Sequence, residues 1–128
     1  MMFRSAESFN QDLGKWDVSR VVDMKMMFRG ANRFNQDLSN WDVSRVTDME
    51  LMFSITKQFN QDLSNWDVSQ VINMEGMFFN ASSFRQTLCG AAWVNSNASK
   101  DGMFNHSLGS IMNTVCGTLR MFGSLFLE

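Results

Sequence analysis

An eleven-residue segment occurs three times in this chain of 128 residues, at an interval of twenty-five. The segment that begins at Phe34 reads Phe-Asn-Gln-Asp-Leu-Ser-Asn-Trp-Asp-Val-Ser, and an identical copy begins at Phe59. A third copy begins at Phe9 and differs at two positions, where Gly14 and Lys15 replace the Ser-Asn pair. A Met-Phe pair keeps the same interval at positions 2–3, 27–28, 52–53 and 77–78. A fixed interval of this length indicates a solenoid, in which each repeat forms one coil and neighbouring coils bury a continuous core.

The repeat is regular over residues 2–88 and becomes irregular after Leu88. Trp93 comes two residues later than the interval requires, and the Met-Phe pair reappears at 103–104 after a step of twenty-six. We therefore expect residues 1–128 to form a single solenoid fragment, with regular repeats over 2–88 and degenerate coils or a cap over 89–128. We also expect this fragment to belong to a longer array.

Each repeat contains two different patterns of apolar residues. Residues 41–44 (Trp-Asp-Val-Ser) alternate apolar and polar side chains, which predicts a short strand with one buried face. One face of a short helix is predicted by the spacing of Met49, Met52, Phe53, Thr56 and Phe59. The polar residues before each such segment are expected to cap the helix, and they are Asp23, Asp48 and Asn73. Asn35 and Asn60 are expected to end helices in a left-handed conformation.

The pattern Leu-x-x-Trp-x-Val, at 13–18, 38–43 and 63–68, resembles the strand signature of leucine-rich repeats. The longer string from Phe-Asn-Gln-Asp-Leu to Met-x-x-Met-Phe resembles the repeats of BspA-like leucine-rich repeat surface proteins, including the mycoplasma-type domain of unknown function. This resemblance implies an α/β repeat solenoid with one short parallel strand and one short helix per coil; a parallel β-helix is the alternative. It also implies a surface or secreted protein with a role in adhesion, and it carries over no catalytic residue. The buried asparagine ladder of the standard repeat is not expected, because valine occupies positions 21, 46 and 71.

Stacking places equivalent residues of successive coils above one another. We expect Trp16, Trp41 and Trp66 to form a buried column. The aspartates that follow these tryptophans should project from the opposite, open face of the sheet, where they would repel one another. Hydrogen bonds from nearby serines, a bound calcium ion or a partner could offset that repulsion. The resulting candidate binding residues are Asp17, Asp42, Asp67, Ser19, Ser44 and Ser69. Asx turns are expected instead at Asp12, Asp37 and Asp62.

Two cysteines and three glycosylation sequons lie in the last third of the chain. Cys89 and Cys116 share a Cys-Gly context about one coil apart, which favours a disulfide, with free buried thiols as the alternative. Two cysteines and a single histidine do not make a zinc site, so no metal site is predicted. The sequons begin at Asn80, Asn97 and Asn105. Together these features favour an extracellular or cell-surface location.

Composition and charge exclude several classes of function. The formal charge of −2 argues against nucleic acid binding, and no apolar run is long enough to span a membrane or to serve as a signal peptide. His106 is the only histidine, and no nucleophile with a base and an orienting group can be assembled, so no enzyme is predicted. We therefore expect a non-catalytic, adhesion-type module that binds a protein or surface glycan through the open sheet face. No cofactor is expected, with calcium as the alternative, and an intracellular protein–protein scaffold of the same fold is the alternative function.

Overall fold

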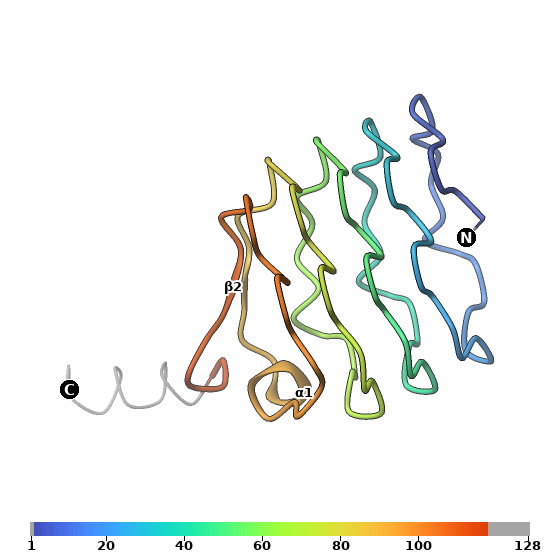
Figure 1. Cartoon of the computed structure of the whole chain (residues 1–128). Helices are drawn as coiled ribbons and strands as arrows, with labels where there is room; N and C mark the ends of the chain where they lie inside the picture. The colour runs from blue at the N-terminus through green and yellow to red at the C-terminus, as the bar shows by residue number, and fades with distance from the viewer. Residues whose placement is uncertain (1, 118–128) are drawn as a thin grey trace, which may run out of the picture.

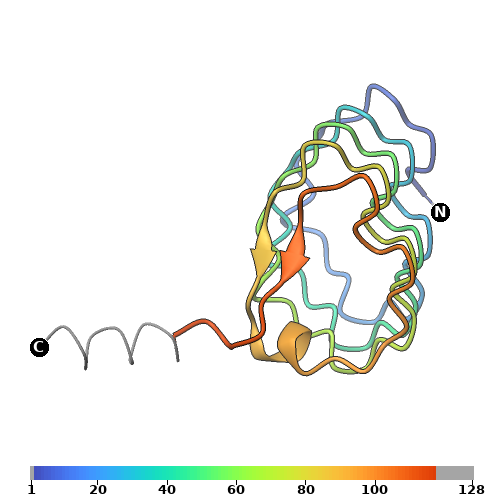
Figure 2. The ribbon, with the colours of Figure 1, turned by 60° about the vertical axis from the view of Figure 1, so that its left-hand side comes forward.

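The computed structural model describes residues 2–117 and arranges them as successive coils that lie side by side (Figure 1). Turned by 60°, the traces of the coils nearly superimpose as a series of loops around a common interior (Figure 2). Regular secondary structure is sparse: strand β1 covers Thr87–Leu88, helix α1 covers Ala91–Val94 and strand β2 covers Ser110–Ile111. β1 and β2 pair in parallel, with Thr87 opposite Ser110.

Backbone hydrogen bonds between neighbouring coils hold the stack together. The backbone amides of Met24, Met26 and Phe28 each donate a hydrogen bond of 2.9 Å to the carbonyl of the residue twenty-four positions later in the chain. Isolated parallel bridges join one residue of each coil to its equivalent in the next, in the order Asp23, Asp48, Asn73 and Ser99. The bridges and the alternating amides make a discontinuous ladder across the coils.

The segment that follows each bridge is a run of turns, so the prediction of a helix there was wrong. The amide of Met52 donates to the carbonyl of Met49, while the amides of Leu51 and Phe53 donate to the next coil. Leu51 and Ile55 have φ angles of 55° and 60°, and a positive φ at the third residue is what a type II turn requires. The physical reason is spacing: a helix is about 10 Å across, whereas hydrogen-bonded backbones lie about 4.8 Å apart.

The strand predicted over residues 41–44 does not form; residues 41–43 have no regular secondary structure and lie between two turns. The Trp41 amide donates to the carbonyl of Leu38, and the Val46 amide donates to the carbonyl of Val43. These amides close turns within their own coil, so they form no ladder with the next coil. The alternation of buried Trp41 and Val43 with exposed Asp42 was nevertheless predicted correctly.

The polar residues at the bridges act locally, although they cap no helix. The side-chain oxygens of Asp23, Asp48 and Asn73 each accept a hydrogen bond from the backbone amide two residues later, at 2.9–3.0 Å. This is the geometry of an Asx turn. The sequence therefore identified the acceptor correctly and misassigned the structure that it stabilises.

An asparagine ladder is present, at a position other than that of the standard leucine-rich repeat. Asn10 Oδ1 accepts hydrogen bonds from the Asn35 amide and from Gln36 Nε2, both at 3.0 Å. The same pair of bonds links Asn35 to the next coil, at Asn60 and Gln61. Asn35 and Asn60 do not have the positive φ that was expected of them; their side chains join coils instead of ending helices.

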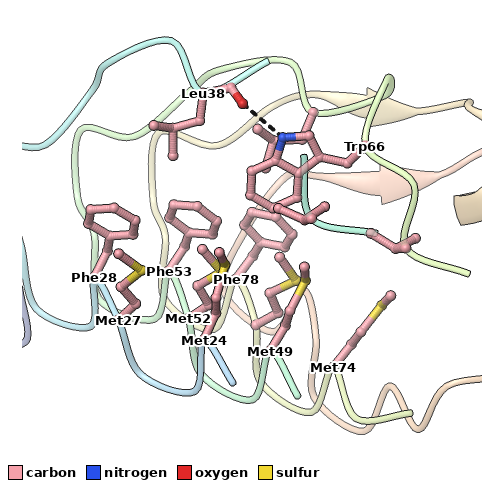
Figure 3. Packing of buried hydrophobic residues seen from close by; sticks show 14 of the residues in the cluster. Met24, Met27, Phe28, Leu38, Met49, Met52, Phe53, Trp66, Met74 and Phe78 are labelled. Carbon is pink, nitrogen blue, oxygen red and sulfur yellow. Dashed lines mark hydrogen bonds between the residues drawn. The ribbon is translucent and has the colours of Figure 1, made fainter. Parts of the chain in front are cut away.

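The interior is filled by columns of equivalent apolar side chains (Figure 3). Ring centroids of Phe28, Phe53 and Phe78 stack at 5.4 and 5.5 Å from one coil to the next. The indole N–H of each of two buried tryptophans also donates a hydrogen bond to a leucine carbonyl of the preceding coil. Trp41 Nε1 donates to Leu13 and Trp66 Nε1 donates to Leu38, both at 2.9 Å. The stack is therefore fixed by directional bonds as well as by apolar burial.

The first coil departs from the prediction at Trp16, which was expected to be buried. Its side chain remains 43% exposed, against 4% for Trp41 and 1% for Trp66. Trp16 has Phe3 as a ring neighbour at 5.7 Å, and its indole N–H makes no hydrogen bond to another described residue. Position in the stack alone does not decide burial, because Leu13, the first member of its own column, is only 2% exposed.

Candidate functional site

Asp17 and Asp42 are exposed, and each accepts the same two hydrogen bonds from the serine two residues later. The hydroxyl and the amide of Ser19 donate to Asp17 Oδ1, at 2.6 and 3.0 Å. Ser44 makes the same two bonds to Asp42 Oδ1, at the same distances. The serine hydroxyl, followed by the serine amide, lowers the pKa of each carboxyl below its ordinary value, because both donors stabilise the charged form. We call the exposed row of Asp17, Asp42, Asp67 and the serines two residues after each the Asp–Ser column.

The third member of the column differs from the first two. Asp67 Oδ1 accepts a bond from the Ser69 amide at 3.0 Å, and no bond from the Ser69 hydroxyl is formed. Arginine follows the serine in the first two coils, and Arg45 contributes to the lowered pKa of Asp42, whereas Gln70 stands at this place in the third coil. Asp67 and Ser69 therefore keep hydrogen-bonding capacity that is used internally at the other two positions.

A groove of about 690 Å³ opens beside Asp67 and Ser69. Its other wall is the segment that contains α1, because the two extra residues before Trp93 are accommodated there as a helical turn. Trp93 itself is buried and donates Nε1 to the Leu63 carbonyl at 2.8 Å, like the earlier tryptophans. Polar lining residues of the groove include Ser64, Asn65, Asn95 and Asn97. The groove is a place where a carboxylate, hydroxyls and amides face a common space.

The second set of aspartates forms the Asx turns that the sequence predicted. Asp12, Asp37 and Asp62 each accept a bond from the amide two residues later, at 2.8–2.9 Å. The Ser39 amide and then its hydroxyl lower the pKa of Asp37. Within the described part of the chain, no group of three or more His, Cys, Asp or Glu residues is arranged to hold a metal ion. These aspartates are therefore turn-forming residues.

Comparison with known proteins identifies the family. Residues 1–114 match the family model described as Mycoplasma protein of unknown function, DUF285. The chain belongs to the DUF285 family. No curated protein and no solved structure matches this DUF285 chain. No helix among its described residues is long and apolar enough to cross a membrane.

The structure of the DUF285 chain joins Cys89 and Cys116 by a disulfide. Their Cα atoms lie 5.0 Å apart, and the Cys116 amide donates to the Cys89 carbonyl at 2.8 Å. Asn80, Asn97 and Asn105, the three sequon asparagines, are all exposed, and Asn97 lines the groove beside Asp67. The cysteines and Asn97 thus border the same end of the stack.

Sequence reasoning missed the groove and the asparagine ladder of the DUF285 chain. The groove depends on where two inserted residues project, which no periodicity reveals. The ladder had a signal in the sequence, namely Asn-Gln repeated at the same interval as the core, because stacked Asn and Gln side chains form amide ladders when their backbones are held in register.

Proposed function

We propose that this DUF285 chain is a non-catalytic interaction module of the BspA-like leucine-rich repeat type, which binds a protein or surface glycan outside the cell. The observation that carries the proposal is the Asp–Ser column with its adjoining groove. Its aspartates are exposed, are repeated once per coil and are fixed by hydrogen bonds to their own serines. A preorganised polar surface loses little conformational freedom when a partner binds.

The third coil supports the proposal that contact centres on Asp67. The carboxylate of Asp67 and the hydroxyl of Ser69 face the groove, together with the amide side chains of Asn95 and Asn97. Paired donors and acceptors of this kind recognise hydroxyl groups and backbone amides, while Val71 and Ile72 offer apolar surface beside them. We propose no catalytic role, since His106 is exposed and packs only its ring edge on Phe79, at 5.9 Å.

The test is a binding screen of the full chain against a glycan array and a panel of secreted proteins. The double variant Asp42→Asn/Asp67→Asn removes two charges and keeps the oxygens that cap the turns, so its fold should be unchanged. We expect it to lose the binding that the wild-type chain shows. Glu7→Gln is the matched control, because Glu7 is an exposed carboxylate outside the Asp–Ser column. Binding that survives in the double variant, or no binding by the wild type, would contradict the proposal.

The location has a separate test in the intact mass of the protein from its native host, measured without reductant. A mass two hydrogens below that of the reduced chain, with added glycan, would support an extracellular site. Free thiols on an unmodified chain would favour the intracellular scaffold.

A further inference from the structure

A second surface lies on the turns that follow the bridges between coils. The residues two positions after the bridge residues form a charged column, Lys25, Glu50, Glu75 and Asp101. Lys25 Nζ lies 3.0 Å from Glu50 Oε2, so a lysine of one coil neutralises the carboxylate of the next. Hydrogen bonding to Glu50 and its negative charge raise the pKa of Lys25.

The other two carboxylates of this column have no basic partner. Glu75 Oε1 accepts a hydrogen bond from the Ser99 hydroxyl at 2.6 Å, and Asp101 is exposed. The Lys25–Glu50 contact is the ion pair of this column. Lys25 is therefore the one cation of a column with three carboxylates, and the last two members of the column are both acidic. Arg29, in the neighbouring column, also lines the groove described next.

A groove of about 410 Å³ runs beside these carboxylates. Gly76 and Gly102 line it, at the positions where the earlier coils carry Met26 and Leu51, and the Leu51 side chain packs over Gly76. Both glycines have positive φ, 60° and 64°, so the turn keeps its shape while the side chain is absent. The glycines form the floor between the charged column and a second wall, to which Ser54 and Phe79 belong.

The second wall contains polar groups that lack partners. Ser54 is only 1% exposed, it lines the groove, and its Oγ has no hydrogen-bond partner. Arg29, one coil earlier in the same wall, has a buried Nε that also lacks an acceptor. Phe79 is 36% exposed and lines the groove. Buried polar groups are normally paired, so Ser54 Oγ, as donor or acceptor, and Arg29 Nε, as donor, are available to hydrogen-bond a ligand in the groove.

We propose that this groove binds a basic segment of a partner protein, with a lysine or arginine side chain between Glu75 and Asp101. The charged head would repeat the contact that Lys25 makes with Glu50, and it would donate to the Ser54 hydroxyl. The ring of Phe79 would contact the aliphatic stem of that side chain. A backbone carbonyl of the same segment would accept from Arg29. The site uses none of the residues of the Asp–Ser column and stands independently of the function proposed above.

The experiment is an amide NMR titration of the full chain with the peptide Gly-Lys-Gly-Lys-Gly. We expect saturable shifts confined to the groove, namely Arg29 and residues 50–54, 75–79 and 101–105. A peptide with norleucine in place of both lysines, which keeps the stem and removes the charge, should cause no such shifts. Shifts that are spread over the surface, that are equal for both peptides, or that are absent up to about 10 mM peptide would overturn the proposal.

Variants separate binding from folding. Glu75→Gln/Asp101→Asn should weaken lysine-peptide binding by about tenfold or more. Glu7→Gln, an exposed carboxylate away from the groove, should leave the binding unchanged. Ser54→Ala removes a buried hydroxyl that has no partner, so it should weaken peptide binding while the melting temperature stays the same or rises. Gly102→Asn keeps a residue that tolerates positive φ, and its side chain should block the floor of the groove. Unchanged affinity in the charge double variant or in Gly102→Asn would overturn the proposal.

Discussion

Neighbouring coils are joined differently in the regular repeats and in the last pair of coils. In the regular repeats, Asn35 and Asn60 donate their amides to asparagine side chains of the preceding coil. In the last pair, the Ser110 amide donates directly to the Gln86 carbonyl, and β1 pairs with β2. Two features accompany the difference. Arg85 stands where Asn10, Asn35 and Asn60 stand earlier and offers no side-chain amide oxygen, and the pairing of Thr87 with Ser110 is two residues shorter than the repeat.

Within the regular repeats, the distance between stacked rings of neighbouring coils differs between the edge with the asparagine ladder and the edge with the backbone bridges. On the asparagine side, Phe34 and Phe59 stack at 6.0 Å, as do Phe59 and Phe84. On the side of the bridges, Phe28 and Phe53 stack at 5.4 Å. The wider spacing lies beside the asparagine ladder and the closer one beside the direct backbone bonds, although Trp41 and Trp66 are further apart still, at 6.5 Å. The apolar columns run through the whole stack, whereas the polar groups that link neighbouring coils differ from one region to the other.

The largest expected effect tests whether both regions share one core. Trp66→Ala and Trp93→Ala should each lower the free energy of unfolding by about 3–5 kcal/mol, because both side chains are fully buried and donate their indole N–H to a leucine carbonyl. Trp16→Ala should cost about half as much, since that side chain is 43% exposed. Urea denaturation measures all three. A harmless Trp93→Ala would mean that the last coils fold separately from the regular ones.

The disulfide belongs only to the irregular region and should stabilise it selectively. Replacing Cys89 and Cys116 together by serine should lower stability by about 2–4 kcal/mol, because the unfolded chain gains the freedom of a 27-residue separation. Hydrogen exchange should quicken in residues 89–117 and change little in residues 13–63. Uniform acceleration along the chain would show instead that the disulfide supports the whole stack.

The asparagine ladder can be tested against the position that interrupts it. Asn35→Ala removes the acceptor of two hydrogen bonds from the next coil and should cost about 1–3 kcal/mol in thermal or urea unfolding. Arg85→Ala, at the equivalent position, should change stability by no more than about 0.5 kcal/mol. Asn40→Ala is the control for asparagine outside the ladder, because Asn40 is exposed and makes no side-chain hydrogen bond. Equal costs at positions 35 and 85 would contradict the account of the junctions.

The smallest effect is a pH dependence confined to the regular repeats. Serine donors lower the pKa of Asp17, Asp37 and Asp42 in the folded state. Their contribution to stability is therefore present above the unfolded pKa, near 3.8, and is lost as the pH falls through the lower folded pKa. The triple Asp→Asn variant should show a shallower fall in melting temperature below about pH 4 than the wild type. As the pH falls, amide hydrogen exchange should quicken first in the first two regular coils. If the melting temperature of the triple variant falls with pH as steeply as that of the wild type, these three carboxylates are not the cause of the acid sensitivity.

Much of the candidate site was predictable because its contacts are local. An aspartate two residues before a serine predicts the hydrogen bond that Asp17 and Asp42 make, and the interval of twenty-five predicts that Lys25 meets Glu50. The two grooves were not predictable. One depends on the direction in which the α1 segment projects, and the other depends on two glycines lying side by side in neighbouring coils.

The sequence by itself determined which residues face inward, how far apart equivalent residues lie, and which polar side chains close turns. These properties depend on periodicity and on contacts within a few residues. Only the tertiary structure decided that Met49, Met52 and Phe53 belong to turns and not to a helix. The spacing that favours a helix in an isolated segment is the same spacing that these turns use to aim side chains inward. Coils joined by backbone hydrogen bonds about 4.8 Å apart leave no room for a helix about 10 Å wide, so contact with the next coil overrides the local preference.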